Sequence, residues 1–199
     1  MATARRSRLS LDARREQLVD LGVQIFSERP YDEVSIDDIA AAAGISKGLL
    51  YHYFPSKRDF YVDVVRYSAS EMVSFTEPDR TLEPPARLIA SLDRYLDYVE
   101  SHARGYLTVL RAGIGSDPEV AAVVEHVRSQ MVERTLADIP HGGDGPPAPL
   151  RIAVRGWIGF VEAASMDWLE HRGMPRDRLR DMLASQLGAA LEAAGGTPR

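Results

Sequence analysis

The segment from Ser35 to Lys57, with the sequence SIDDIAAAAGISKGLLYHYFPSK, constrains the fold more than any other part of this chain. Ser35 can cap a helix, and Asp38, three residues later, completes a capping-box pattern. Gly44 is suited to end that helix because glycine adopts positive φ without steric cost. Ser46 can cap a second helix almost at once. So short a turn predicts two steeply crossed helices, as in a helix-turn-helix unit.

The second of these helices has side chains that suit a nucleic acid better than water. Tyr51, His52 and Tyr53 follow one another, and no acidic residue occurs from Ile45 to Arg58. Phenol and imidazole groups can donate hydrogen bonds to phosphate oxygens. Gly48 in mid-helix costs about 1 kcal/mol relative to alanine, which indicates that something must approach closely there. The alternative is a pair of core helices with half-buried tyrosines and solvated lysines.

Over residues 14–65 the chain resembles the DNA-binding domain of the TetR (tetracycline-repressor) family of bacterial transcriptional regulators. The matching positions are Phe26, Ser35, Ile39, Ala40, Ala43, Gly44, Ile45, Ser46, Gly48, Leu50, Tyr51, Phe54 and Lys57. The resemblance implies that Lys47, Gly48 and Leu49 lie nearest the base edges, although Leu49 could also pack on the scaffold. The residues that it implies for contacts to the sugar-phosphate backbone are Ser35, Ser46, Tyr51, His52, Tyr53 and Lys57.

One departure from the family pattern concerns the end of the second helix. Many members have the order aromatic-aromatic-His-Phe, whereas this chain has the order YHYF at residues 51–54. Which of His52 and Tyr53 contacts phosphate is therefore left open by the sequence.

The net charge of the chain argues weakly against a nucleic-acid partner, but the local charge favours one. The formal net charge is -5 and the isoelectric point is about 5.6. Arg5, Arg6 and Arg8 nevertheless form a short basic arm, and Lys57 and Arg58 follow the second helix.

The chain of 199 residues contains no cysteine, which excludes disulfides, thiolate catalysis and cysteine zinc sites. The N-terminus lacks the apolar run of a secretory signal, and no stretch approaches the length of a membrane span. We therefore expect a cytoplasmic protein without a membrane partner.

The remaining pattern predicts an all-α fold, because no alternating stretch is bounded by hairpin signals. We expect about nine helices. Those outside the central pair are expected to span approximately residues 12–28, 57–75, 88–102, 106–111, 118–131, 150–170 and 175–193. The expected organisation is a basic arm over 1–11, a three-helix DNA-binding domain over 12–56, and a helical ligand-binding and dimerisation domain over 57–199.

The last two helices are the candidates for a dimer interface. The penultimate one has apolar residues on more than one face, and such a helix needs more than one packing partner. The candidate interface residues are Trp157, Val161, Ala164, Leu183, Leu187, Ala190 and Leu191. The alternative is that both helices are internal to one chain.

The family resemblance also implies a pocket for a small organic ligand in the second domain. The candidate lining residues, which combine apolar bodies with a few polar tips, are Tyr95, Tyr98, Tyr106, Met131, Trp157, Phe160 and Met166. Aromatic residues at helical spacing are more often part of a plain core. No histidine or carboxylate spacing indicates a metal, and no cofactor is expected.

The prediction is a sequence-specific transcriptional regulator that binds a palindromic operator as a homodimer. A repressor released by its ligand is favoured, and an activator or a co-repressed regulator of the same fold is the alternative. A helical enzyme or a protein-binding adaptor is less well supported. Gly113 to Ser116 is no nucleophile elbow, and the glycines near Gly142 have no following lysine.

Overall fold

The computed structural model describes residues 11–113, 117–141 and 145–195, which form nine α-helices and one short 3-10 helix without a strand. This confirms the predicted all-α fold. The chain divides into two compact units between Ser68 and Ala69. The division falls inside helix α4 (Lys57–Phe75) rather than at its start, because the first half of that helix packs in the core of unit 1. The expected basic arm lies, except for Leu11, outside the described residues.

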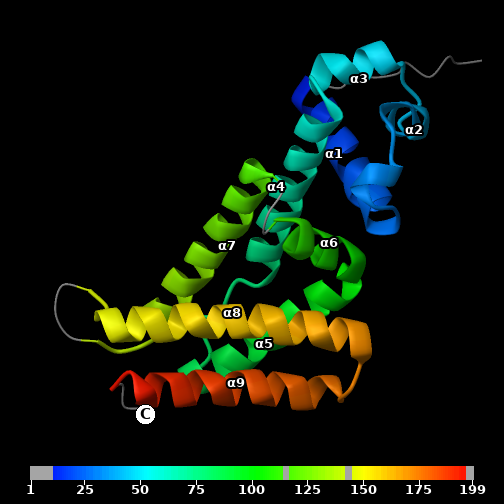
Figure 1. Cartoon of the computed structure of the whole chain (residues 1–199). Helices are drawn as coiled ribbons and strands as arrows, with labels where there is room; N and C mark the ends of the chain where they lie inside the picture. The colour runs from blue at the N-terminus through cyan, green and yellow to red at the C-terminus, as the bar shows by residue number, and fades with distance from the viewer. Residues whose placement is uncertain (1–10, 114–116, 142–144, 196–199) are drawn as a thin grey trace, which may run out of the picture. The chain divides into compact units, whose positions relative to one another are not determined.

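Unit 1 contains the three helices that precede α4. They are α1 (Leu11–Glu28), α2 (Ile36–Ala42) and α3 (Lys47–Tyr53) (Figure 1). A single turn of 3-10 helix, η1 (Tyr31–Glu33), connects α1 to α2 and was not predicted.

The core of unit 1 is formed by apolar residues from all four helices. Ile39, Leu50 and Phe60 are completely buried. Gly22 lies where α1 meets α4, and a Cβ atom on it would lie 2.4 Å from Cγ2 of Val64. Only glycine therefore allows these two helices to approach as closely as they do.

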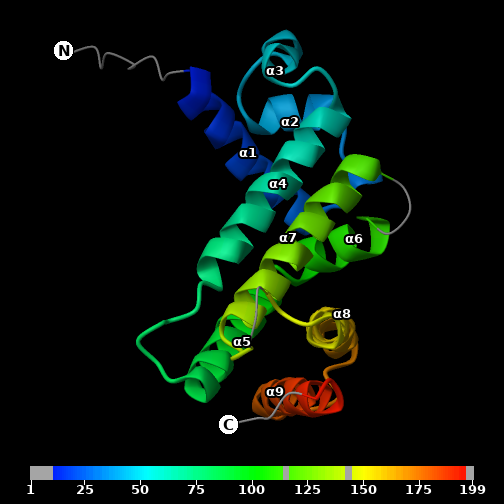
Figure 2. The same ribbon diagram turned by 90° about the vertical axis from the view of Figure 1, so that its left-hand side faces the viewer.

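Unit 2 contains the rest of α4 and five further helices. These are α5 (Pro84–Ser101), α6 (Ala103–Gly113), α7 (Pro118–Ala137), α8 (Ala148–His171) and α9 (Arg176–Ala193) (Figures 1 and 2). Asp117 caps α7 by accepting a hydrogen bond from the backbone N–H of Glu119 at 2.9 Å. Helix α8 ends at Arg172, which has a left-handed backbone with φ of 48°.

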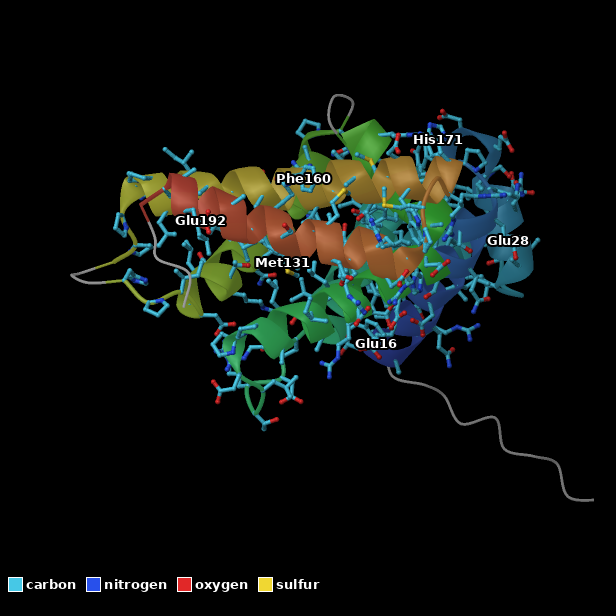
Figure 3. The ribbon with its side chains drawn as sticks, turned by 90° about the horizontal axis from the view of Figure 1, so that it is seen from below. Glu16, Glu28, Met131, Phe160, His171 and Glu192 are labelled. Atoms are coloured by element: carbon cyan, nitrogen blue, oxygen red, sulfur yellow. The ribbon has the colours of Figure 1, made fainter. Side chains whose placement is uncertain are left out.

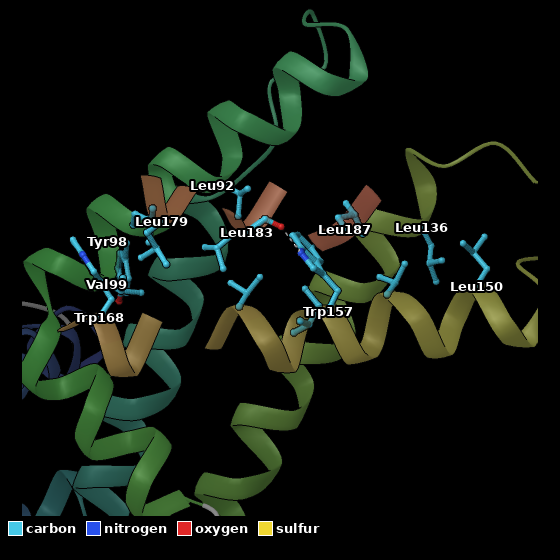
Figure 4. Close-up of a cluster of buried hydrophobic side chains, with 14 residues drawn as sticks. Leu92, Tyr98, Val99, Leu136, Leu150, Trp157, Trp168, Leu179, Leu183 and Leu187 are labelled. Atoms are coloured by element: carbon cyan, nitrogen blue, oxygen red, sulfur yellow. Dashed lines mark hydrogen bonds between the residues drawn. The ribbon is translucent and has the colours of Figure 1, made fainter. Parts of the chain in front are cut away.

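The core of unit 2 lies between α5, α8 and α9, and α8 and α9 run side by side in both ribbon views (Figures 1 and 2). Figure 4 shows its apolar side chains, with Leu183 and Trp157 near the centre. The indole N–H of Trp157 donates a hydrogen bond of 2.8 Å to the backbone carbonyl of Leu183. That bond satisfies the single polar atom of a buried tryptophan.

Ion pairs join α5 to α9 at the edge of this core. The guanidinium of Arg176 reaches the carboxylates of Asp93 at 3.0 Å and Asp97 at 2.6 Å. Arg180, one turn later, also contacts Asp93 at 3.3 Å. Within the described residues, no helix is both long enough and apolar enough to span a lipid bilayer.

Candidate nucleic-acid interface

Local capping fixes the ends of α2 and the start of α3, as predicted. The Ser35 hydroxyl accepts a hydrogen bond of 3.1 Å from the backbone N–H of Asp38, and the Asp38 carboxylate accepts one of 2.9 Å from the backbone N–H of Ser35. Gly44 follows with φ of 63°. The Ser46 hydroxyl then accepts from the backbone N–H of Leu49 at 3.2 Å. Because both helices are capped from within the segment, the turn between them is specified locally.

The two faces of α3 differ sharply in exposure. Leu50 and the following Phe54 anchor the helix in the core of unit 1, with exposed fractions of 0% and 1%. Leu49 and Tyr51, on the outer side, are 41% and 43% exposed. Lys47, Gly48 and His52 are exposed as well. A short helix that exposes a leucine, a tyrosine, a lysine and a histidine offers both apolar and hydrogen-bonding side chains, which suit contacts to base edges and phosphates.

His52 and Tyr53 are not equally available to a partner. His52 is exposed, whereas Tyr53 is half-buried and packs against the core of unit 1. Their rings meet edge to face with centroids 5.5 Å apart. The geometry therefore favours His52 over Tyr53 for a phosphate contact.

Lys57 has a role inside the unit that the sequence did not reveal. Its ammonium donates hydrogen bonds of 2.7 Å to the backbone carbonyls of Tyr31 and Val34. It also lies 3.9 Å from the centre of the Tyr31 ring. Two of its three N–H donors thus tie the connection between α1 and α2 to the start of α4, and only the third remains for the predicted phosphate contact.

Gly48 is not required by the packing of the protein itself. A Cβ atom built on this residue would meet nothing within 4 Å. The position is the exposed second residue of α3, and glycine is a poorer helix former than alanine. The space above Gly48 is therefore available for a close approach from outside the chain.

The charges around α3 are arranged in two local pairs. Lys47 Nζ lies 2.9 Å from Asp37 Oδ2, and this hydrogen bond raises the pKa of Lys47. The backbone hydrogen bond from Ser35 lowers the pKa of Asp38, and Arg29 lies 3.5 Å from the same carboxylate. The acid at Asp38 serves the capping box, whereas Asp37 faces the lysine of α3.

The predicted ligand residues of unit 2 do not form one group. Trp157 and Tyr98 lie in the apolar core, with exposed fractions of 6% and 7%, and Tyr98 stacks on His102. Met131 packs against this core, and Met166 is half-buried. Phe160 is 37% exposed, unlike the core residues, and its contact with a ligand stays a prediction. Its side chain lies on the same side of α8 as two exposed glycines.

The structure does bring the other two predicted ligand residues, Tyr95 and Tyr106, together. Their hydroxyls share a hydrogen bond. Burial raises the pKa of Tyr95 to about 12 and the pKa of Tyr106 well above its ordinary value. The ion pair between Arg128 and Glu162, with a shortest distance of 2.7 Å, lies within electrostatic reach of both rings. Each of these four residues is partly buried, and we call them the buried polar cluster.

Four of the predicted dimer-interface residues lie in the core of a single chain. Trp157 and Val161 are each 6% exposed, Leu183 is 0% exposed and Leu187 is 6% exposed. Side chains this buried offer little surface to a second chain, and their assignment to a dimer interface stays a prediction. Ala164, Ala190 and Leu191 are half-exposed. The sequence indicated that α8 is apolar on more than one face, but not which face the chain itself covers.

The face of α8 that remains uncovered lies opposite its buried side. It consists of the exposed residues Ile152, Gly156, Gly159, Phe160 and Ala163, which recur at helical spacing and which we call the outer face of α8. Ile152 is 70% exposed. Figure 3 labels Phe160 near the middle of this helix. Among the described residues, no group of three or more histidine or acidic side chains is placed to hold a metal ion.

Comparisons with known proteins agree with this geometry. Residues 18–64 match the family model described as bacterial regulatory proteins of the tetR family. Residues 84–190 match the model described as the tetracyclin repressor-like C-terminal domain. The second match alone covers more than half of the chain.

One relative and one solved structure are similar over nearly the whole chain, and a second relative is similar over a shorter part of it. The transcriptional activator FasR of Mycolicibacterium smegmatis is 32% identical over 195 residues, which cover 96% of this chain and 86% of FasR. The transcriptional repressor DhaR of Mycobacterium sp. is 38% identical over 77 residues, covering 37% of this chain and 39% of DhaR. The crystal structure of a tetR-family regulator from Streptomyces coelicolor superimposes with a TM-score of 0.86 at 33% identity, covering 94% of this chain and 84% of that one.

Three observations lead to one assignment. Two family models match in the expected order, one relative matches along most of its length, and the capped helix-turn-helix has an exposed second helix. The chain is a DNA-binding regulator of transcription, not an enzyme, and it belongs to the TetR family.

Proposed function

We propose that the protein binds an inverted-repeat operator as a homodimer, with α3 of each subunit in the major groove. The observation that carries this proposal is the exposed side of α3, with Lys47, Leu49, Tyr51 and His52 facing outward and Gly48 leaving open space. A helix of seven residues reads only a few base pairs. Two copies on successive major grooves, about 34 Å apart, double the contacts. Such a regulator works in the cytoplasm, where bacterial DNA lies.

The outer face of α8 is the proposed centre of the dimer interface. Ile152 and Phe160 expose apolar area that association would remove from water. A Cβ atom on Gly156 or Gly159 would meet nothing within 4 Å of its own chain, so neither glycine is needed for intrachain packing. Both would allow the backbone of a partner helix to approach closely.

A charge on the outer face of α8 tests the dimer. Phe160→Glu is expected to convert the dimer to monomers, as measured by sedimentation velocity, because burying an unpaired carboxylate is unfavourable. Phe75→Glu is the matched control, since Phe75 is 49% exposed and lies on α4. A wild-type protein that sediments as a monomer, or a Phe160→Glu variant that stays a dimer, contradicts this part of the proposal.

Substitutions on α3 test the DNA interface. The duplex is first selected from a randomised pool by the wild-type protein. Lys47→Ala and Tyr51→Ala are each expected to weaken its binding by about tenfold or more in fluorescence anisotropy. Arg178→Ala, which removes an exposed cation from α9, is the control and should change affinity little. If neither α3 variant binds more weakly than the wild type, α3 is not the recognition helix.

A small organic effector bound in unit 2 is the proposed signal. The buried polar cluster supports this, because partly buried hydroxyl and charged groups beside an apolar core can orient a ligand. An effector acts only through its different affinities for the arrangements that do and do not bind DNA, usually with a coupling of about 1 to 3 kcal/mol. Helix α4 contains residues of both units and is the continuous element available to transmit the difference.

Repression relieved by the effector is the first candidate for the sign of regulation, and activation is the second. Activation is favoured by the similarity to FasR, an activator, along 96% of this chain. Repression is favoured by the shorter similarity to DhaR, a repressor. A transcriptional reporter driven by the promoter beside the selected operator distinguishes them. Its output should rise on deletion of the regulator gene if the protein represses, and fall if it activates.

A further inference from the structure

An ion pair links the two helices of the helix-turn-helix on their exposed side. Asp37 lies in the first turn of α2, and Lys47 is the first residue of α3. The ammonium of Lys47 and the carboxylate of Asp37 are 2.9 Å apart, and the two side chains are 49% and 71% exposed. The lysine proposed to reach the base edges is therefore occupied by a carboxylate when no DNA is bound.

Helix capping does not explain the acid at this position. The adjacent Asp38 accepts the backbone N–H of Ser35 at 2.9 Å and completes the capping box. Arg29 lies 3.5 Å from Asp38, so that carboxylate is also partly neutralised. Asp37 takes no part in the cap, and its recorded partner is Lys47. Favourable interaction with the helix dipole is available to either acid and needs only one of them.

A carboxylate next to the recognition helix opposes binding to any DNA. No aspartate or glutamate occurs from Ile39 to Arg58, so Asp37 and Asp38 are the last acidic residues before the recognition helix. Phosphates repel the carboxylate, and Lys47 must leave it to reach a new acceptor. When Lys47 moves from Asp37 to a single exposed phosphate, little free energy is gained, because one exposed ion pair replaces another. The gain in free energy is larger when Lys47 meets the O6 and N7 acceptors of guanine in the major groove.

We infer that Asp37 is a specificity-determining residue, which holds Lys47 in the free protein and penalises DNA that offers Lys47 no base acceptor. The inference rests on the proposed role of α3. It assigns to Asp37 the repulsive element that specific recognition requires alongside attractive contacts. The residue acts on the difference in affinity between operator and unrelated DNA, rather than on the operator affinity itself.

The experiment compares two duplexes of equal length, one selected from a randomised pool by the wild-type protein and one with the same bases shuffled. Asp37→Asn is expected to bind the shuffled duplex about three- to tenfold more tightly, and the selected duplex with a smaller change. The logarithm of its affinity should also fall more steeply with the logarithm of salt concentration, by up to about one unit. The specificity ratio should therefore decrease.

Asp20→Asn is the matched control, because it makes the same change in net charge on an exposed residue of α1. The double variant Asp37→Asn/Lys47→Ala tests whether Asp37 acts through the lysine, in which case the gain in affinity disappears. An Asp37→Asn variant that behaves like Asp20→Asn overturns the inference. A gain that persists in the double variant overturns it as well, since the effect is then long-range repulsion alone.

Failure of the proposed function gives a different result. If Lys47→Ala binds both duplexes as well as the wild type, α3 does not read DNA, and the inference falls with it. Circular dichroism should show that Asp37→Asn melts like the wild type, because the cap between Ser35 and Asp38 is intact.

Discussion

Unit 1 exposes its functional polar and aromatic groups to solvent, whereas unit 2 holds its own between helices. In unit 1, Lys47, Tyr51 and His52 face outward from a helix anchored by buried Leu50. In unit 2, the hydroxyls and charges of the buried polar cluster are partly buried between helices. The first arrangement suits a large external partner, and the second suits a small molecule that enters the protein.

The two units also differ in how far apart in sequence their functional groups lie. The groups of α3 lie within one segment of the chain, between caps that act over three residues. The buried polar cluster combines residues of α5, α6, α7 and α8, which only the packing of those helices brings together. Function can therefore be recognised from the sequence in unit 1, whereas in unit 2 it depends on tertiary structure.

The largest expected effect is the loss of stability caused by Leu183→Ala in unit 2, which is compared with Leu49→Ala in unit 1. Leu183→Ala should lower the free energy of unfolding by about 2 to 5 kcal/mol, because it leaves a cavity in a closed core. Both tryptophans of the chain lie in α8, so tryptophan fluorescence during urea denaturation reports on unit 2 alone. Leu49→Ala, in unit 1, should leave thermal melting followed by circular dichroism unchanged and weaken DNA binding. Equal loss of stability from both variants would contradict the exposure assigned to α3.

The two lysines of the DNA-binding unit should respond differently to the same substitution. Lys57→Met is expected to lower the stability of unit 1 by about 1.5 to 3 kcal/mol, because it leaves the carbonyls of Tyr31 and Val34 without a charged donor. Thermal melting followed by circular dichroism measures this loss. Lys47→Met should melt like the wild type but bind the operator more weakly. A Lys57→Met variant that loses only DNA affinity would show that phosphate contact is its main role.

Alkaline pH should destabilise unit 2 through its buried tyrosines. The pKa of Tyr95 is raised by burial from 10.0 to about 12, so between these values the unfolded chain binds fewer protons than the folded one. Stability is thus fully present below pH 10 and is lost as pH rises towards about 12, by up to about 1.4 kcal/mol per pH unit for each such tyrosine. Urea denaturation followed by tryptophan fluorescence measures the slope, which should become shallower in Tyr95→Phe. An unchanged slope in that variant would contradict the assignment.

The smallest expected effect on stability is that of Gly48→Ala. The substitution should stabilise α3 slightly, by at most about 1 kcal/mol, because alanine is the better helix former and its Cβ meets open space. DNA affinity should nevertheless fall severalfold, if a groove approaches this position. Gly105→Ala, at a helical glycine of α6 whose Cβ also meets nothing, should leave DNA binding unchanged. Unaltered affinity in Gly48→Ala would exclude a close approach at this residue.

Several features of the site were beyond prediction from the sequence. The hydrogen bonds from Lys57 to the connection between α1 and α2 join residues on different elements, as does the ion pair between Asp37 and Lys47. No local sequence pattern predicts either contact. Nothing in the sequence near Gly22 indicates that α4 leaves no room for a side chain there. Apolar periodicity likewise predicts that the faces carrying Trp157 and Leu183 are covered, but not whether the same chain or a second one covers them.

The amino-acid sequence by itself determined the all-α fold, the caps of α2 and α3, the sharp turn at Gly44 and the side chains available on α3. It could do so because caps, glycine backbone preferences and helical periodicity act within one or two turns of chain. Tertiary structure alone decided which side of α8 is enclosed, which tyrosines meet and which lysine remains exposed. Those outcomes depend on the docking of segments that are distant in sequence, where each contact is set by the shape and placement of both surfaces.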